Sequence, residues 1–233
     1  MSKANSDNPW TKLPSGGQYV LEQDRGDIEA FNKKHHGNSD KEIHLELFPE
    51  PYLGDPKAPV VLLNLNPGFD EHDPEAHQNA AFAKQSRRNL RHQAAYPFYL
   101  LDPKLKFAPG YHWWKKKLKP LMDALDDPHG EKVSRGVFCV EFFPYHSKKF
   151  SEHWNLSVLP SQAYSFVLVQ EAINRKALIL IMRSAKRWHK HVPALKTYDR
   201  DRWEDASSPQ NPTISCKNFP RLFDKAVCEL RAL

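Results

Sequence analysis

Two asparagines follow an apolar run directly and form the first group of residues that could do chemistry. The apolar residues 59–63 (PVVLL) lead into Asn64-Leu65-Asn66-Pro67-Gly68-Phe69. Asn-Pro and Pro-Gly are common turn dipeptides, and an asparagine side chain can cap such a turn locally. Alternatively, the rigid loop aims the Asn66 amide and backbone N–H groups at a ligand. An amide is no strong base, so its chemistry would be the positioning of water or of a polar ligand.

A second apolar run, 136–145 (GVFCVEFFPY), contains Glu141 and is followed by His146. A carboxylate in an apolar strand is costly unless it is paired or hydrogen-bonded. The sequence leaves two interpretations open. Glu141 is tied to a buried arginine or to backbone N–H groups, or it contacts a ligand or a water molecule at the end of the strand.

Basic residues gather in two further segments. The segment 111–125 (YHWWKKKLKPLMDAL) has the spacing of an amphipathic helix whose tryptophans pack in the core. Its lysines, Lys115 among them, either form a solvated face or meet phosphates. Arg183 and Lys186 follow a third apolar run and belong either to an exposed helix start or to an anion-facing edge.

A second Asn-Pro occurs near the C-terminus, in 211–215 (NPTIS). Alone it predicts a turn, in which Asn211 and Thr213 precede Ser215, a candidate N-cap of the last helix. Together with the first Asn-Pro loop, it becomes a candidate part of the same functional site.

Strands and helices alternate along the chain and must position these side chains. Three strands are continuous apolar runs, a pattern typical of parallel strands that are buried on both faces; a fourth is short. The alternation predicts right-handed crossovers and a three-layer α/β/α sandwich with a four-stranded, mainly parallel sheet, whose ligands bind beyond the carboxyl ends of the strands. The predicted strands are 59–65, 136–145, 177–184 and 194–199, and the predicted helices are a short one in 18–36, then 77–94, 111–125, 160–176 and 217–233.

Length and composition limit the possible classes. The 233 residues suit a single domain, 1–233, with residues 1–54 as an N-terminal arm that packs on it. The net charge of +6 is compatible with a nucleic-acid partner. Three scattered cysteines argue against zinc fingers, iron–sulfur clusters and a disulfide framework. We expect a cytoplasmic monomer without metal or cofactor, because the apolar runs are short and no signal peptide pattern begins the chain.

The order of the motifs resembles the uracil-DNA glycosylase superfamily, above all its mismatch-specific and single-strand-selective branches. Asn64-Leu65-Asn66-Pro67-Gly68 is similar to the G-x-N-P-G motif after the first strand, with Asn64 in place of glycine. The segment 109–115 (PGYHWWK) is similar to P-G-x-x-F-W-K, and 211–215 to the N-P-S-x-L-S motif before the last helix. The resemblance covers residues 55–233.

The resemblance implies a DNA repair hydrolase that flips a damaged or deaminated base out of DNA and hydrolyses its N-glycosidic bond. Asn66 would orient the attacking water. Glu141 would repel a leaving anion or read a donor edge such as an amino group, so the base need not be uracil. The base-binding residues would be Asn64, Phe69, Glu141 and His146, and the DNA-binding residues Lys115, Arg183, Lys186, Asn211, Thr213 and Ser215.

Two other functions remain open on the sequence. One is a non-catalytic nucleic-acid-binding protein of the same fold. The other is an enzyme that acts on a small nucleotide or nucleoside in the same pocket without a duplex.

Overall fold

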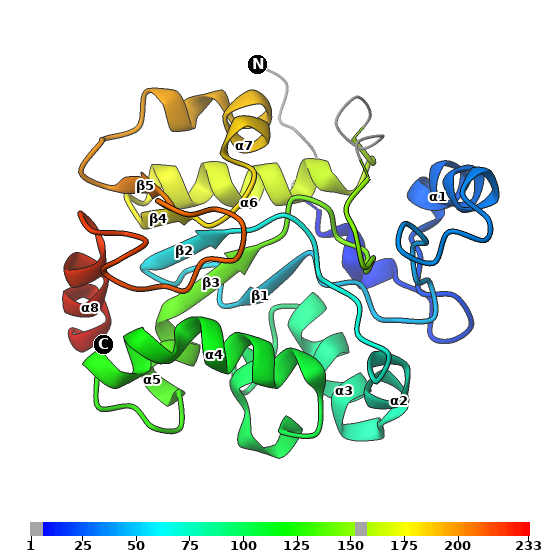
Figure 1. The fold of residues 1–233 in the computed structure, drawn as a ribbon, viewed down its shortest axis with the longest axis horizontal. Helices are drawn as coiled ribbons and strands as arrows, with labels where there is room; N and C mark the ends of the chain where they lie inside the picture. The colour runs from blue at the N-terminus through cyan, green and yellow to red at the C-terminus, as the bar shows by residue number, and fades with distance from the viewer. Residues whose placement is uncertain (1–6, 152–157) are drawn as a thin grey trace.

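The computed structural model describes residues 7–151 and 158–233 and shows an α/β fold built on a mixed sheet (Figure 1). The sheet has five strands in the order β1-β3-β2-β4-β5. The four strands β3, β2, β4 and β5 run parallel to one another. The edge strand β1 pairs with β3 in the antiparallel sense. Their bounds are Tyr52–Gly54 (β1), Val60–Leu63 (β2), Val137–Val140 (β3), Leu178–Ile181 (β4) and Trp203–Asp205 (β5).

Two details of the predicted sheet are wrong. The sheet has five strands instead of four, because the extended stretch before β2 adds β1 at one edge. The predicted strand 194–199 is instead a 3-10 helix, Pro193–Lys196 (η5). Pro193 favours the first turn of a helix because its ring fixes φ and it has no N–H to donate. The outer parallel strand is β5, which pairs Trp203 with Ile179.

Eight α-helices of the described chain cover the two faces of the sheet. The predicted helix 77–94 is interrupted by Asn79, whose side chain accepts the backbone N–H of Ala81 at 2.9 Å and so caps a new helix. The helices are α1 (Glu22–Lys34), α2 (Asp73–Gln78), α3 (Ala80–Leu90), α4 (Pro109–Ala124), α5 (Glu131–Gly136), α6 (Gln162–Asn174), α7 (Ala185–His191) and α8 (Phe223–Arg231).

The central strands are apolar throughout because each of their faces is buried against a separate core. On β2, Val60 and Leu62 belong to a core with α4, α5 and α8, whereas Val61 and Leu63 belong to a core with α1, α6 and α7. Figure 1 shows α4 and α5 on one side of the sheet and α6 and α7 on the other, which gives three layers. Within the described residues, no helix combines the length and the apolar character that crossing a bilayer requires.

Candidate functional site

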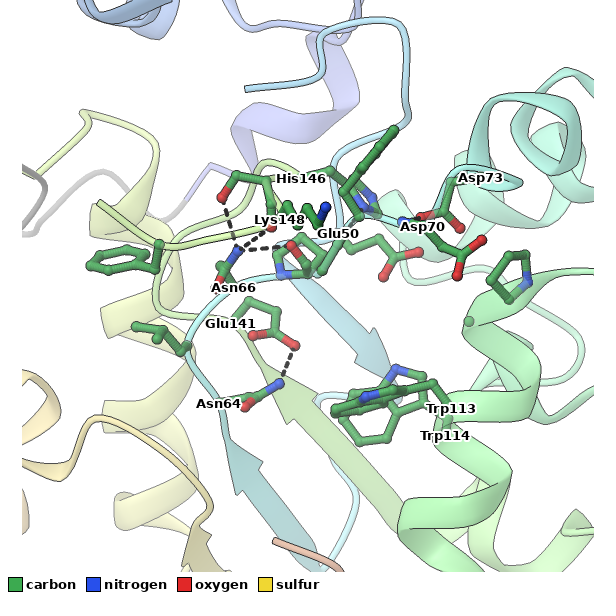
Figure 2. A pocket seen from close by; sticks show the side chains of 18 of the residues that line it. Glu50, Asn64, Asn66, Asp70, Asp73, Trp113, Trp114, Glu141, His146 and Lys148 are labelled. Atoms are coloured by element: carbon green, nitrogen blue, oxygen red, sulfur yellow. Dashed lines mark hydrogen bonds between the residues drawn. The ribbon is translucent and has the colours of Figure 1, made fainter. Parts of the chain in front are cut away.

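A cavity of about 730 Å³ lies beyond the carboxyl ends of β2, β3 and β4. Its walls come from the segments that follow these three strands, from the first turns of α4, and from α2 and the end of the N-terminal arm. Figure 2 shows Asn64, Asn66 and Glu141 on one side, the carboxyl groups of Glu50, Asp70 and Asp73 on another, and Trp113 and Trp114 across from them. Cavities of this size hold small organic ligands.

The segments after β2 and β3 run side by side past the ends of the strands. Backbone N–H groups of Asn64 and Phe143 donate to Val140 and Leu65, at 3.0 and 2.8 Å respectively. The arm joins the same ladder, because the Glu50 N–H donates to Pro144 at 2.9 Å. Side chains from three distant segments therefore converge on one edge of the sheet.

Six of the eleven predicted site residues line this cavity, and five lie outside its wall. The six come from the ends of β2, β3 and β4 and are Asn64, Asn66, Phe69, Glu141, His146 and Arg183. The five come from α4, α7 and the loop before α8 and are Lys115, Lys186, Asn211, Thr213 and Ser215.

The Asn66 amide is fixed in one orientation. Its Nδ2 donates to the carbonyl oxygens of Pro67 and Ser147, at 2.8 and 3.3 Å, and lies 3.2 Å from the Ser147 hydroxyl. Because carbonyl oxygens only accept, these partners require the NH₂ group, not the oxygen, at this position. The Oδ1 atom accepts no hydrogen bond from the described residues and remains the free acceptor of a side chain that lines the cavity.

Glu141 is paired with Asn64 and not with a buried arginine. Asn64 Nδ2 donates to Glu141 Oε1 at 2.9 Å, and the second atoms of both groups, Asn64 Oδ1 and Glu141 Oε2, are buried without a described partner. Burial raises the pKa of Glu141 to about 8, although Asn64 and the charge of Arg183 act in the opposite direction. The carboxyl group is therefore largely protonated at neutral pH.

Glu50 is a second buried carboxyl group of the cavity and was not predicted. The Tyr99 hydroxyl donates to its Oε1 at 3.0 Å, and its Oε2 has no hydrogen-bond partner among the described residues. Burial raises the pKa of Glu50 to about 7, and the charge of His146 opposes this rise. Asp73 lies on the same side, and burial raises its pKa to about 6.

Glu50, His77 and His146 form a compact cluster with one potential ligand atom from each within 4.8 Å of the others. Their hydrogen bonds do not fit a metal. His77 Nδ1 accepts the Phe48 N–H at 2.9 Å, which places the hydrogen of the neutral ring on Nε2. Both nitrogens of His146 face carbonyl oxygens, those of Gly68 at 2.7 Å and Phe48 at 3.0 Å, and so already have partners within the protein. Three of the four ring nitrogens of the two histidines are thus already engaged in hydrogen bonds within the protein.

Aromatic rings border the cavity on two sides. The Phe69 ring stacks on His44, with centroids 3.6 Å apart and an angle of 2° between the planes. Trp114 is buried, as the helical spacing predicts, but Trp113 is 37% exposed. Both tryptophans line the cavity and meet edge to face at 4.6 Å. A planar ligand could stack on these rings.

The loop before α8 is fastened to α4. The Lys117 ammonium donates to the backbone carbonyl of Asn211 at 3.0 Å and also to its side-chain oxygen. Burial, then the charges of Lys116 and Arg183, lower the pKa of Lys117 to about 8. Lys117 thus feels the charge of the cavity residue Arg183, although neither Lys117 nor Asn211 lines the cavity. The Thr213 and Ser215 hydroxyls lie 3.2 Å apart in the same loop.

Lys115 and Lys186 lie on the outer surface. Lys115 Nζ donates to the Tyr111 hydroxyl at 3.2 Å, and the exposed Lys186 lies in the first turn of α7. Lys148 and Lys149, which follow His146, do line the cavity and pair with Asp40. The basic groups that line the cavity are therefore Lys148, Lys149, Arg183 and Arg187.

The fold and the site together define an α/β protein with a polar, aromatic-lined cavity at the carboxyl edge of its parallel strands. No protein-family model, curated protein or solved structure matches this chain.

Proposed function

We propose that this protein hydrolyses the N-glycosidic bond of a damaged or deaminated base in DNA. The observation that carries the proposal is the convergence of Asn64, Asn66, Phe69, Glu141 and His146 on one cavity at the carboxyl edge of the sheet. These residues come from two motifs that are more than 70 positions apart in the chain. The resemblance to the uracil-DNA glycosylase superfamily assigns the same residues to the base and the water.

The proposed chemistry depends on positioning more than on strong bases. The fixed amide of Asn66 holds a water molecule through its free Oδ1 beneath the C1′ atom of the sugar. The Phe69 ring and the Trp113 ring stack on the base after it has left the duplex. As the C1′–N bond breaks, positive charge develops on the sugar, and the carboxyl groups of Glu50 and Asp73 stabilise it when they are ionised.

The DNA backbone is proposed to lie across the cavity mouth. Arg183 lines the cavity, and its guanidinium makes no hydrogen bond or ion pair with any residue that the structure describes. Lys115 and Lys186 would add charge outside the cavity, and the loop 211–215, which Lys117 fastens to α4, would be a further contact to the DNA backbone. Such contacts to phosphates make affinity depend on salt.

The test is a base-release screen on DNA that carries uracil, hypoxanthine, xanthine or a mismatch. Release by the wild-type protein, and its loss in Asn66→Ala, would support the proposal. DNA binding that weakens with salt, without release of any base, would instead favour a non-catalytic nucleic-acid-binding protein. A rise in melting temperature with nucleosides, and none with DNA, would favour an enzyme of small nucleotides.

A further inference from the structure

Three polar side chains of the cavity wall, those of Asn64, Asn66 and His146, direct their donors at the protein itself. Asn66 Nδ2 donates to Pro67 and Ser147, and Asn64 Nδ2 donates to Glu141. Both ring nitrogens of His146 face backbone carbonyls. A base that leaves as an anion, as uracil does, needs hydrogen-bond donors at its carbonyl oxygens, and these three residues offer none.

The acceptors of the same cavity are free. Asn66 Oδ1 and Glu50 Oε2 have no hydrogen-bond partner among the described residues, and both side chains are more than nine-tenths buried, at 7% exposure each. These two oxygens are open to the cavity that their side chains line, so a ligand that donates hydrogen bonds to them fits this wall.

One wall of the cavity is acidic. Glu50 and Asp73 lie on one side with the exposed Asp70, across from the rings of Trp113 and Trp114 (Figure 2). Four basic side chains also line the cavity and have other neighbours. The charge of Arg183 acts on Glu141, Arg187 lies over the Phe150 ring, and Lys148 and Lys149 pair with Asp40. A cation between carboxylates and an indole face gains both charge–charge and cation–π attraction.

We propose that the preferred substrate of this cavity is a nucleobase with a cationic ring, such as an N-alkylated purine, rather than a base that leaves as an anion. This inference rests on the proposed hydrolysis and names its substrate class. The oxygen of water adds to C1′ of the sugar, and the electron pair of the C1′–N bond passes to the ring nitrogen. The cationic ring thereby leaves as a neutral base, and the proton of the water passes to the carboxylate of Glu50.

Two measurements test the substrate class. The first compares single-turnover base release from one duplex that carries either 7-methylguanine or uracil, each corrected for spontaneous loss without protein. The second compares the affinity of 1-methyladenosine, which is cationic at neutral pH, with that of adenosine, through the quenching of tryptophan fluorescence. We expect faster release of 7-methylguanine and roughly tenfold tighter binding of 1-methyladenosine, within the range of a cation–π contact.

Glu50→Gln keeps the size of the side chain and removes its charge. It should abolish most of the preference for 1-methyladenosine while the affinity for adenosine stays within about twofold. The matched control is Glu29→Gln, on the exposed face of α1, which should bind both nucleosides as the wild type does.

The outcomes separate this inference from the proposed function. Release of uracil without 7-methylguanine, or equal affinity for the two nucleosides, would overturn the inference and leave the hydrolase standing. A preference for 1-methyladenosine without release of any base would support the cationic ligand and contradict the hydrolase. If the protein binds neither nucleoside and releases neither base, the inferred substrate class and the proposed hydrolase are both wrong.

Discussion

Replacing Glu50 by glutamine should stabilise the protein at alkaline pH and leave it unchanged in acid. Burial raises the pKa of Glu50 from 4.5 to about 7 in the folded protein. At about 1.4 kcal/mol per pKa unit, this difference corresponds to roughly 3 kcal/mol of unfolding free energy. The folded state binds the proton more tightly than the unfolded chain. The stability that Glu50 contributes is therefore fully present below about pH 4.5 and is lost as the pH rises through about 7.

Glutamine does not ionise and still accepts the Tyr99 hydroxyl at the same position. The groups that act electrostatically on Glu50, namely His146, Tyr99, Asp73 and Glu141, are present in both proteins. The difference between two urea-unfolding curves, taken from about pH 5 to about pH 9, therefore isolates the carboxyl group. We expect the advantage of Glu50→Gln to grow to roughly 3 kcal/mol, or some 6–12 °C in melting temperature. A difference that stays flat with pH, or a variant less stable at alkaline pH, would refute the account of the acidic wall.

Two further predictions concern Glu141 and the sheet. Glu141→Gln should also stabilise the fold in alkali, but its advantage should keep growing up to about pH 8, the raised pKa of Glu141, whereas that of Glu50→Gln levels off near pH 7; coincident pH profiles of melting temperature would contradict this. Gly54→Ala should cost more than about 3 kcal/mol in urea unfolding, because Gly54 has φ +102° and an added Cβ would lie 2.4 Å from the Val137 carbonyl oxygen. Gly16→Ala, with nothing within 4 Å of its Cβ, is the control, and equal losses would show the reasoning to be wrong.

The centre of the sheet could be predicted from the sequence, and its edges could not. The strands β2, β3 and β4 are apolar at every position because both of their faces are buried, which gives an unambiguous pattern. The edge strands β1 and β5 have three residues each and pair on one side, so neither leaves a periodic signal. The segment 194–199 likewise has no periodic pattern that identifies a strand. Pro193, which precedes it, favours the 3-10 helix that the structure shows.

The same distinction holds for the cavity. Residues at the ends of the central strands could be predicted because the carboxyl edge of a parallel sheet is where ligands bind. Glu50 and Asp73 could not, because pairing across the sheet and the packing of α2 bring them there from outside the strand–helix alternation. One signal does exist: Glu50 stands between two prolines in the otherwise apolar stretch 47–53 (LFPEPYL), where a solvated charge is out of place.

The most direct test of the proposed function is the single-turnover rate of base release by Asn66→Ala against that of Asn38→Ala. Asn38 is exposed on the arm and lies outside the cavity, so it is a matched control for the same substitution. The proposal predicts that Asn66→Ala loses roughly 10²–10³-fold in rate, as removal of one positioned polar group does elsewhere. Asn38→Ala should act at the wild-type rate. Equal rates in the two variants, on any base that the wild-type protein releases, would contradict the assignment of catalysis to this cavity.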